Sequence, residues 1–469
     1  MTMSPAAMEV FAALGIADDS FAAPVRIHGQ DPVVSSPHRI GDASAASLAA
    51  LGAEMAALWH SRGGPAQSVD VSIFSAITQL TGSFYTKVNG VSIFDLAEDR
   101  NLFSNTGFYR SSTGRFVHLV LTYPHLRDII CRVLGCPPAA ESLQAAVGQW
   151  DPFELEEAIA AAGGSAAVVR TQGEWRSHPQ GRILASTPLV STELIRTGLP
   201  KSRSQKSPPP KTPMAGIRVL DNTHVIAGPI ATRTMAEHGA DVLHTSVPTR
   251  PDPNPMVIDT SIGKRSAFCD LTDPGQVKKF WELLGETDVF VNSYLGLEAK
   301  GFSSNALAAR TDGIVILDFR SWGLTGPWSQ RKGFDQPVCA ATGIAVEQGS
   351  EQSPALPVTH LLNDYLAAIL GAAGAAEALR RRDEAGGSYH VHVDLARISM
   401  WVQDLGLIPA EQITLLPRPS LTRSPIPLTV STGPWGTTEY LPSQIGYSDY
   451  STGATLPSQP LGAADLTWW

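Results

Sequence analysis

Asp364 is the residue of this sequence whose type and position could most directly do chemistry. It stands near the start of a long Ala-rich segment, HLLNDYLAAILGAAGAAEALRRRDEAGG, whose composition predicts a helix. The free N–H groups and the positive dipole end at a helix start favour a carboxylate or a developing oxyanion there. A carboxylate that is shielded from water can act as a covalent nucleophile. The alternative is an ordinary N-cap, a role that aspartate fills in many helices.

A candidate binding turn lies in the stretch Gly216–Ala240, GIRVLDNTHVIAGPIATRTMAEHGA. Its apolar start predicts a buried strand, its middle a polar turn, and its remainder a helix that ends at Gly239. The sequel DVLHTSV predicts a second strand, so the whole stretch reads as a βαβ unit of a parallel sheet. Such folds bind ligands at the carboxyl ends of their strands, which makes the HVIAGP turn a candidate site. An ordinary strand–helix turn is the alternative.

Two kinds of element are expected to position these residues. After Gly216, the segments SIGKRSAFCDL, TDVFVNSY and GIVILDFRSWG predict strands that alternate with helical patterns. This alternation predicts an α/β fold with a doubly wound parallel sheet. Between about residues 100 and 190, the hairpin pattern GFYRSSTGRFVHLVL, two helical patterns and the strand AAVVR predict a small α+β module.

The chain divides by composition into four segments. Residues 1–197 hold a first Ala-rich helix, a strand and the small module. Residues 198–213, GLPKSRSQKSPPPKTP, have the composition of an extended linker. Residues 214–410 contain the strand–helix alternation and Asp364, and residues 411–469 form a tail rich in Pro, Ser and Gly.

Composition limits the classes of function. The 469 residues are 43% hydrophobic and 17% charged, enough for two or three domains. A net charge of −9 argues against a nucleic-acid partner that depends on phosphate neutralisation. No long apolar run predicts a membrane span, and no secretory leader pattern is present, so a cytoplasmic protein is expected. Scattered cysteines predict buried free thiols and no metal site; they are Cys131, Cys136, Cys269 and Cys339.

The two Ala-rich helices lie in matching sequence contexts. HRIGDASAASLAALGAEMAALW precedes GGPAQSVDVS, and HLLNDYLAAILGAAGAAEALRR precedes GGSYHVHVDLA. The match pairs Asp42 with Asp364. A shared His–Asp start and a shared GG…VD finish favour an internal duplication over chance similarity of low-complexity helices.

These segments resemble family III CoA-transferases of the CaiB/BaiF type. The resemblance runs from Ile217 to about Trp401 and includes VLDNTHVIAGP, GADVLHTSV, GKRSAFCDL and GLTGPWSQRKGFDQ. Residues from about Ser36 to Leu189 resemble the later part of the same family. The chain is therefore similar to a fused, rearranged pair in which one copy lacks its beginning and the other its end.

The resemblance implies a Rossmann-like domain with a small α+β domain, working either as a monomer that acts as a pseudo-dimer or as a homodimer. It implies an enzyme that moves CoA between an acyl-CoA and a small carboxylic acid, without a metal or a membrane partner. Asp364 matches the family's nucleophile, which forms mixed anhydride and aspartyl-CoA intermediates. Residues implied to contact CoA or substrate are His224, Val225, Ala227, Lys264, Arg265, Asn292, Tyr294 and Lys300.

Several departures leave other functions open. The run HTSVPTR lacks a charged Lys–Glu pattern, and SYLGLEAKGF lacks the family's Arg-Pro-Gly loop. A non-catalytic CoA-ester binder is one alternative. An acyl-CoA racemase is another, but the position before Asp335 holds Phe334, which cannot take a proton. Asp335 itself is expected to orient a backbone amide and to have no chemical role. Asp42 is expected to be a helix cap or a remnant of a lost site.

Overall fold

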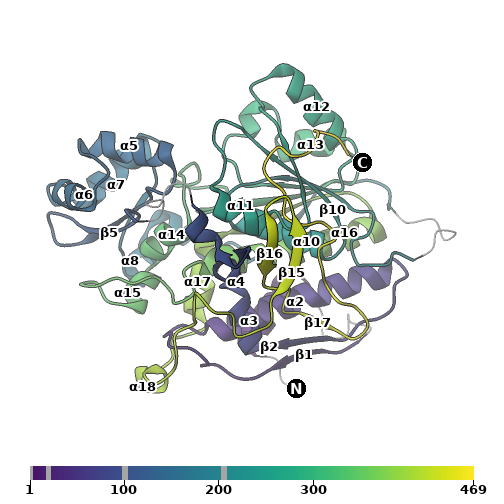
Figure 1. The fold of residues 1–469 in the computed structure, drawn as a ribbon, viewed down its shortest axis with the longest axis horizontal. Coiled ribbons are helices and arrows are strands. Elements are labelled where there is room, and N and C mark those ends of the chain that lie inside the picture. Colours follow the sequence, from purple (N-terminus) through teal and green to yellow (C-terminus); the bar gives the residue numbers. More distant parts are fainter. Residues whose placement is uncertain (1–3, 17–22, 98–103, 202–208, 469) are drawn as a thin grey trace.

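A seven-stranded sheet forms the centre of the computed structural model, which describes residues 4–16, 23–97, 104–201 and 209–468 (Figure 1). Its strand order is β11-β10-β9-β12-β13-β14-β8. Pairing is parallel throughout except at the β8 edge. The strands are β8 (Ser191–Arg196), β9 (Arg218–Asn222), β10 (Asp241–Ser246), β11 (Arg265–Phe268), β12 (Val289–Asn292), β13 (Val315–Arg320) and β14 (Ser388–Asp394). The predicted α/β fold with a doubly wound parallel sheet is confirmed.

The central strands form where the sequence is continuously apolar. Val219, Leu220, Val289 and Val291 are fully buried, because helices cover both faces of the sheet. The strand order reverses between β9 and β12, so the loops that follow these two strands diverge and leave a crevice. The HVIAGP turn follows β9 and therefore lies at this crevice.

Two long Ala-rich helices pack against one another beneath the sheet. They are α2 (Ile40–Ser61) and α16 (Leu362–Ala385), at the two predicted positions. Helix α16 also contacts α10 (Ala227–Glu237), which follows the HVIAGP turn. Most residues of α16 are buried, because small side chains allow close approach on several sides. At Gly371 an added Cβ would lie 2.6 Å from the Phe319 ring of β13. This close packing holds the middle of α16 against β13.

The small module stands apart from the large sheet in Figure 1. Its antiparallel sheet, order β5-β6-β7, contains β5 (Gly107–Arg110), β6 (Phe116–Leu119) and β7 (Ala166–Val168). The predicted hairpin is thus confirmed. Helices of this region are α5 (Pro124–Leu134), α6 (Ala140–Val147), α7 (Pro152–Ala161), α8 (Gln172–Ser177) and α9 (Pro179–Ala185).

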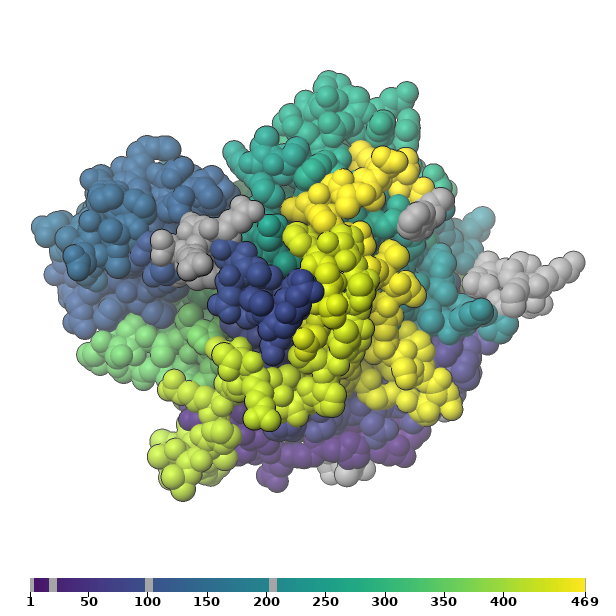
Figure 2. All heavy atoms as spheres, in the orientation of Figure 1, coloured from purple at the N-terminus to yellow at the C-terminus, as the bar shows by residue number. Residues whose placement is uncertain are grey.

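Segments from the two ends of the chain meet in two further sheets. One joins β1 (Val25–His28), β2 (Val69–Ser72) and β17 (Gly446–Tyr447). The other joins β3 (Lys87–Val88) and β4 (Val91–Ser92) with β15 (Thr429–Gly433) and β16 (Gly436–Tyr440). The C-terminal segment, yellow in Figures 1 and 2, thus lies across one face of the molecule. Residues 202–208 of the expected linker lie outside the described ranges, and the four-segment division stays a prediction.

The remaining elements connect these units. They are α1 (Pro5–Ala13), α3 (Ile73–Gln79), α4 (Gly82–Tyr85), η1 (Ile93–Leu96), α11 (Asn254–Thr260), α12 (Pro274–Leu284), η2 (Glu298–Lys300), α13 (Ser304–Arg310), α14 (Asp335–Thr342), α15 (Ile344–Gln348), α17 (Leu395–Asp404) and α18 (Ala410–Ile413). Within the described ranges, no helix has the length and apolar character needed to cross a membrane. The same residues contain no cluster of three or more His, Cys, Asp or Glu side chains suited to a metal ion.

Candidate active site

Asp364 lies in the first turn of α16, but it does not cap the helix. The N-cap residue is Leu361, which provides no side-chain hydrogen bond. The backbone N–H of Asp364 instead donates to Oδ2 of Asp335 at 2.8 Å. The N-cap interpretation of Asp364 is therefore wrong, and Asp335 performs that task, as predicted for a residue that orients a backbone amide. The Asp364 carboxylate is left available for other contacts.

A buried polar group holds the Asp335 carboxylate in place. Oδ1 of Asp335 accepts from the Asn363 side chain at 3.3 Å and from the Cys339 thiol at 3.3 Å. The Asn363 carbonyl oxygen in turn accepts from Ser399 Oγ at 2.8 Å. All of these side chains are buried, so their mutual hydrogen bonds compensate for lost water. The group gives the start of α16 a fixed position.

Burial disfavours the ionised forms of both aspartates, and the charge of Asp335 further disfavours that of Asp364. Burial raises the pKa of Asp335 to about 6, although its hydrogen bonds act in the opposite direction. Burial, and then the negative charge of Asp335, raise the pKa of Asp364 well above its usual range. Such a carboxylate, once ionised, is poorly solvated and therefore more reactive than one in water.

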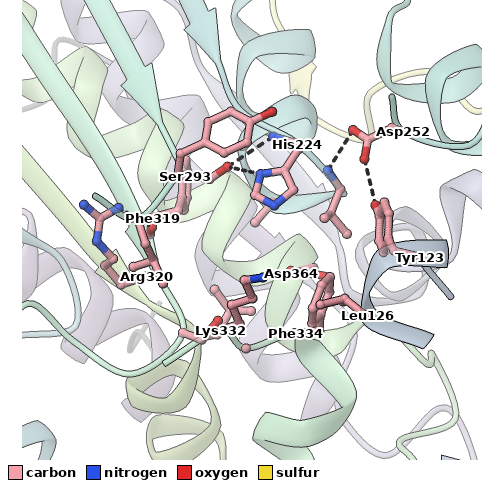
Figure 3. A pocket seen from close by; sticks show the side chains of 18 of the residues that line it. Tyr123, Leu126, His224, Asp252, Ser293, Phe319, Arg320, Lys332, Phe334 and Asp364 are labelled. Atoms are coloured by element: carbon pink, nitrogen blue, oxygen red, sulfur yellow. Dashed lines mark hydrogen bonds between the residues drawn. The ribbon is translucent and has the colours of Figure 1, made fainter. Parts of the chain in front are cut away.

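Asp364 lines two cavities that meet at its side chain. The first, of about 290 Å³, lies at the carboxyl ends of β9, β12 and β13. In Figure 3, Asp364 lies between Arg320 and Lys332 on one side and Tyr123 and Leu126 of the small module on the other. The second cavity, of about 480 Å³, has a mainly apolar and aromatic lining. Both cavities are lined by Tyr123, Val225, Phe334 and Asp364.

The HVIAGP turn forms one wall of the first cavity. His224 stacks on the Tyr294 ring, with centroids 4.4 Å apart, and its Nδ1 lies 3.0 Å from Ser293 Oγ. Burial lowers the pKa of His224, which favours the neutral ring. Val225 has a φ of 69°, a strained conformation for a β-branched residue. The structure thus brings His224, Val225, Tyr294 and Asp364 together around this cavity, and Ala227 also lines it.

Asp252 joins the small module to this turn. Its Oδ1 accepts from the Tyr123 hydroxyl at 2.7 Å, and its Oδ2 accepts from the Val225 N–H at 3.0 Å. Because Tyr123 precedes α5 of the small module, one carboxylate fixes both walls of the cavity and also supports the strained backbone at Val225. Asp252 was not predictable from the sequence, since a lone Asp in a Pro-rich loop gives no signal.

Cations gather around the outer part of the crevice. Arg250, Arg320, Arg331 and Lys332 line the first cavity. Arg250 also lines an adjoining cavity of about 450 Å³ beside β10 and β11, where Lys300 lies. The HTSVPTR run, which lacks the Lys–Glu pattern, thus still ends in a cation that lines both of these cavities, Arg250. Together these side chains form a positive rim suited to phosphates, in which Arg331 also pairs with Glu157 and Arg320 with Asp318.

Three predicted binding residues do not reach the cavities. Lys264 is 1% exposed, and its ammonium donates to Asp221 Oδ2 at 2.9 Å and to the Pro229 carbonyl at 2.7 Å. Arg265 pairs with Asp241 and donates to the Thr467 carbonyl. Asn292 is buried, with its amide donating to Asp318 at 2.7 Å. Their polar groups are engaged inside the protein, so the geometry opposes direct contact of these residues with CoA.

The start of α2 repeats the arrangement at the start of α16. The backbone N–H of Asp42 donates to Oδ2 of Asp31 at 2.8 Å, as that of Asp364 does to Asp335. The N-cap residue of α2 is Arg39, so the interpretation of Asp42 as a cap is wrong. The signal for Asp31 was present in the sequence, because Gly29-Gln30-Asp31 has the same G-x-D pattern as Gly333-Phe334-Asp335.

The sequence model of CoA-transferase family III matches residues 12–192 and 214–419. These two segments cover more than half of the chain. The chain therefore belongs to CoA-transferase family III. Two separate matched segments are consistent with a two-copy fusion.

Curated relatives carry names of the same class. The chain is 34% identical over 201 residues to the acetyl-coenzyme A transferase nodX of Hypoxylon pulicicidum, covering 41% of this chain and 34% of the relative. It is 29% identical to an acyl-CoA transferase of Gibberella moniliformis, covering 59% and 51% respectively. It is 27% identical to the succinyl-CoA–L-malate CoA-transferase alpha subunit of Chloroflexus aurantiacus, covering 49% and 55%. The chain thus spans between a third and just over half of these relatives.

A solved CaiB/BaiF family protein from Brucella suis is also similar. Its sequence identity is 21% and its TM-score 0.38, with 41% of this chain and 55% of that chain covered.

Proposed function

We propose that this chain transfers CoA between an acyl-CoA donor and a carboxylic acid, with Asp364 as the covalent nucleophile. The observation that supports this most is the place of Asp364, where a cation-rimmed cavity and an apolar cavity meet. A thioester held across this junction would have its pantetheine on the cation side and its acyl group on the apolar side. The scissile carbonyl would then lie beside the carboxylate.

The chemistry proceeds by exchange of acyl partners on this side chain. An ionised Oδ of Asp364 attacks the thioester carbonyl, the C–S bond breaks, and CoA leaves as thiolate with a mixed anhydride on Asp364. The thiolate attacks the aspartyl carbonyl and releases the donor acid, which leaves an aspartyl-CoA thioester. The acceptor carboxylate then attacks the aspartyl-CoA thioester and releases the CoA thiolate, which leaves a second mixed anhydride. The thiolate attacks the acceptor's carbonyl in this anhydride, so that a new acyl-CoA forms and Asp364 is regenerated. No net proton, electron or water is consumed.

Covalent capture tests this proposal. The wild-type chain is incubated with a panel of acyl-CoAs, with and without hydroxylamine or borohydride, and its intact mass is measured. An adduct of CoA mass that hydroxylamine removes, mapped to Asp364 by peptide analysis, is expected. Binding of acyl-CoAs without an adduct from any donor would overturn the proposal and support a non-catalytic CoA-ester-binding protein. The segments HTSVPTR and SYLGLEAKGF, which depart from the family pattern, favour that alternative. Racemisation gains no support, since Phe334 provides no base at the cavity junction.

The raised pKa of Asp364 predicts a pH-dependent rate of capture. Because attack requires the ionised carboxylate and the folded pKa lies above the usual value, adduct formation is expected to accelerate as pH rises above about 4. Asp335→Asn removes the neighbouring charge but keeps an oxygen that can accept the Asp364 N–H. The rate profile of this variant is expected to shift to lower pH. The nearby Tyr123 hydroxyl and Cys339 thiol stay neutral, because burial raises both pKa values. An unchanged profile would show that Asp335 does not influence ionisation at Asp364.

The cationic rim predicts a specific effect on substrate binding. Arg250→Ala and Lys300→Ala are each expected to raise the KM for acyl-CoA about twofold to fivefold with little change in kcat, since exposed ion pairs contribute roughly 0.2–1 kcal/mol. The effect should shrink at high salt. Lys278→Ala is a matched control, because Lys278 is exposed on α12 and lines none of these cavities. A KM unchanged in both rim variants would place the CoA phosphates elsewhere.

A further inference from the structure

The apolar cavity beyond Asp364 differs in chemistry from the rest of the site. Its walls come from both halves of the chain, because α4, η1 and the β5–β6 hairpin face the start of α10, helix α11 and the segment before α16. Apolar side chains that line it are Phe84, Phe94, Phe108, Val120, Val225, Ile226, Pro255, Met256, Phe334, Leu356 and Leu361. At about 480 Å³, it is larger than a short acid such as acetate requires.

No cationic side chain faces this cavity from its described lining. The two histidines there are uncharged at neutral pH, because burial lowers the pKa of His118 to about 3 and also lowers that of His360. Arg418 is near enough to His360 to lower its pKa further, but it does not line the cavity. A bound anion would therefore find no charge of opposite sign among these residues.

The charges that do face the cavity are carboxylates. Asp364 and Asp259 both line it. Asp259 Oδ1 already accepts from Arg233 at 2.9 Å and from Thr86 at 2.5 Å, so its own charge is compensated within the protein. A second carboxylate on a substrate would lose its hydration here and meet two acidic groups, and the described lining offers it only neutral hydrogen-bond donors and no cation.

We infer that this cavity binds the acyl group of the substrate and selects apolar monocarboxylic acids over dicarboxylic acids. The inference rests on the proposed function, in that the thioester is held beside Asp364. Three observations converge on it: Asp364 lines the cavity, its walls are mainly apolar, and its described lining offers no cation. It separates this chain from relatives whose names specify succinyl-CoA and malate.

Binding of two matched thioesters tests the inference. Hexanoyl-CoA and adipyl-CoA have acyl chains of equal length, with a methyl group in one and a carboxylate in the other at the far end. Affinities for the Asp364→Asn variant, which cannot react, are measured by calorimetry with free CoA as the reference. Hexanoyl-CoA is expected to bind more tightly than CoA, and at least about 100-fold more tightly than adipyl-CoA. Equal or tighter binding of adipyl-CoA would overturn the inference, as would hexanoyl-CoA binding no better than CoA.

A cation placed in the wall should reverse this preference. Leu356 is partly buried in the lining, and Leu356→Arg is expected to improve adipyl-CoA binding relative to hexanoyl-CoA, whereas Leu356→Met leaves the ratio unchanged. Covalent capture on the wild-type chain separates the two proposals. If hexanoyl-CoA binds more tightly but no adduct forms, the proposed CoA transfer is contradicted and the inferred selectivity of the cavity is supported. If adipyl-CoA but not hexanoyl-CoA forms an adduct, the proposed CoA transfer is supported and the inferred selectivity of the cavity is contradicted.

Discussion

Replacing Asp364 by asparagine is expected to abolish CoA transfer, lowering kcat by a factor on the order of 10³ or more. The amide keeps the size of the side chain and its place in the first turn of α16, but it cannot form the anhydride. Because the change also removes a buried carboxyl group that repels Asp335, the variant should be at least as stable as the wild type. Turnover with a responsive acyl-CoA and acid pair, together with thermal unfolding, measures both effects.

Asp42→Asn is the matched control for this experiment. Asp42 occupies the same position in α2 and has the same backbone contact to an upstream aspartate, but it lines neither cavity that meets at Asp364. Its replacement should leave kcat within about twofold of the wild-type value. Transfer that survives Asp364→Asn to within tenfold would show that the nucleophile is another residue.

The paired starts of α2 and α16 also bear on the origin of the chain. A chance match between two Ala-rich helices would not reproduce a G-x-D turn whose aspartate caps the helix at the same backbone position. We therefore infer an internal duplication. In α16 the capped turn faces a crevice of the large sheet, whereas β2, the strand after α2, pairs with β1 and β17.

The sequence was informative about the core because periodicity and apolar runs are local properties. The strands at Val289–Asn292 and Val315–Arg320 and both long helices follow from composition alone. Strand β8 does not, since STELIR is mostly polar and half-exposed, and only its antiparallel pairing with β14 makes it part of the sheet. The β15–β16 hairpin was likewise hidden in a tail rich in turn residues, because its partner β3 is far away in sequence.

The site likewise contains residues that local sequence predicts and residues whose role depends on the tertiary fold. Residues on the strand–helix turn, such as His224 and Val225, were predictable because a parallel sheet places them at its carboxyl edge. The contributions of Tyr123 and Arg250 depend on how the small module and a loop fold over that edge. Lys264 was predicted to bind CoA from the family resemblance, and a basic residue beside a strand resembles a phosphate ligand. Its burial, which the sequence does not reveal, removes it from the cavities.

Replacing Lys264 by methionine is expected to destabilise the fold by about 3–5 kcal/mol, because it leaves Asp221 buried without its cation. Although burial opposes ionisation of Asp221, Lys264 and then His244 hold the pKa of that carboxyl well below its usual range. The Lys264 ammonium also binds the Pro229 carbonyl in the first turn of α10, so its loss should loosen the wall of the first cavity. Urea unfolding measures the change.

Lys300→Met serves as the control, because it makes the same Lys-to-Met change at an exposed lysine. Lys300 lines the adjoining cavity beside β10 and β11. Its free energy of unfolding should stay within about 0.5 kcal/mol of the wild-type value, while its KM for acyl-CoA rises. Loss of Lys264 is thus expected to lower the free energy of unfolding, whereas loss of Lys300 is expected to raise KM without changing stability. The two variants therefore distinguish a structural role from a binding role. If Lys264→Met left stability unchanged and raised only KM, its ammonium would contact CoA as the family resemblance implies, and the buried pair with Asp221 would not stabilise the fold.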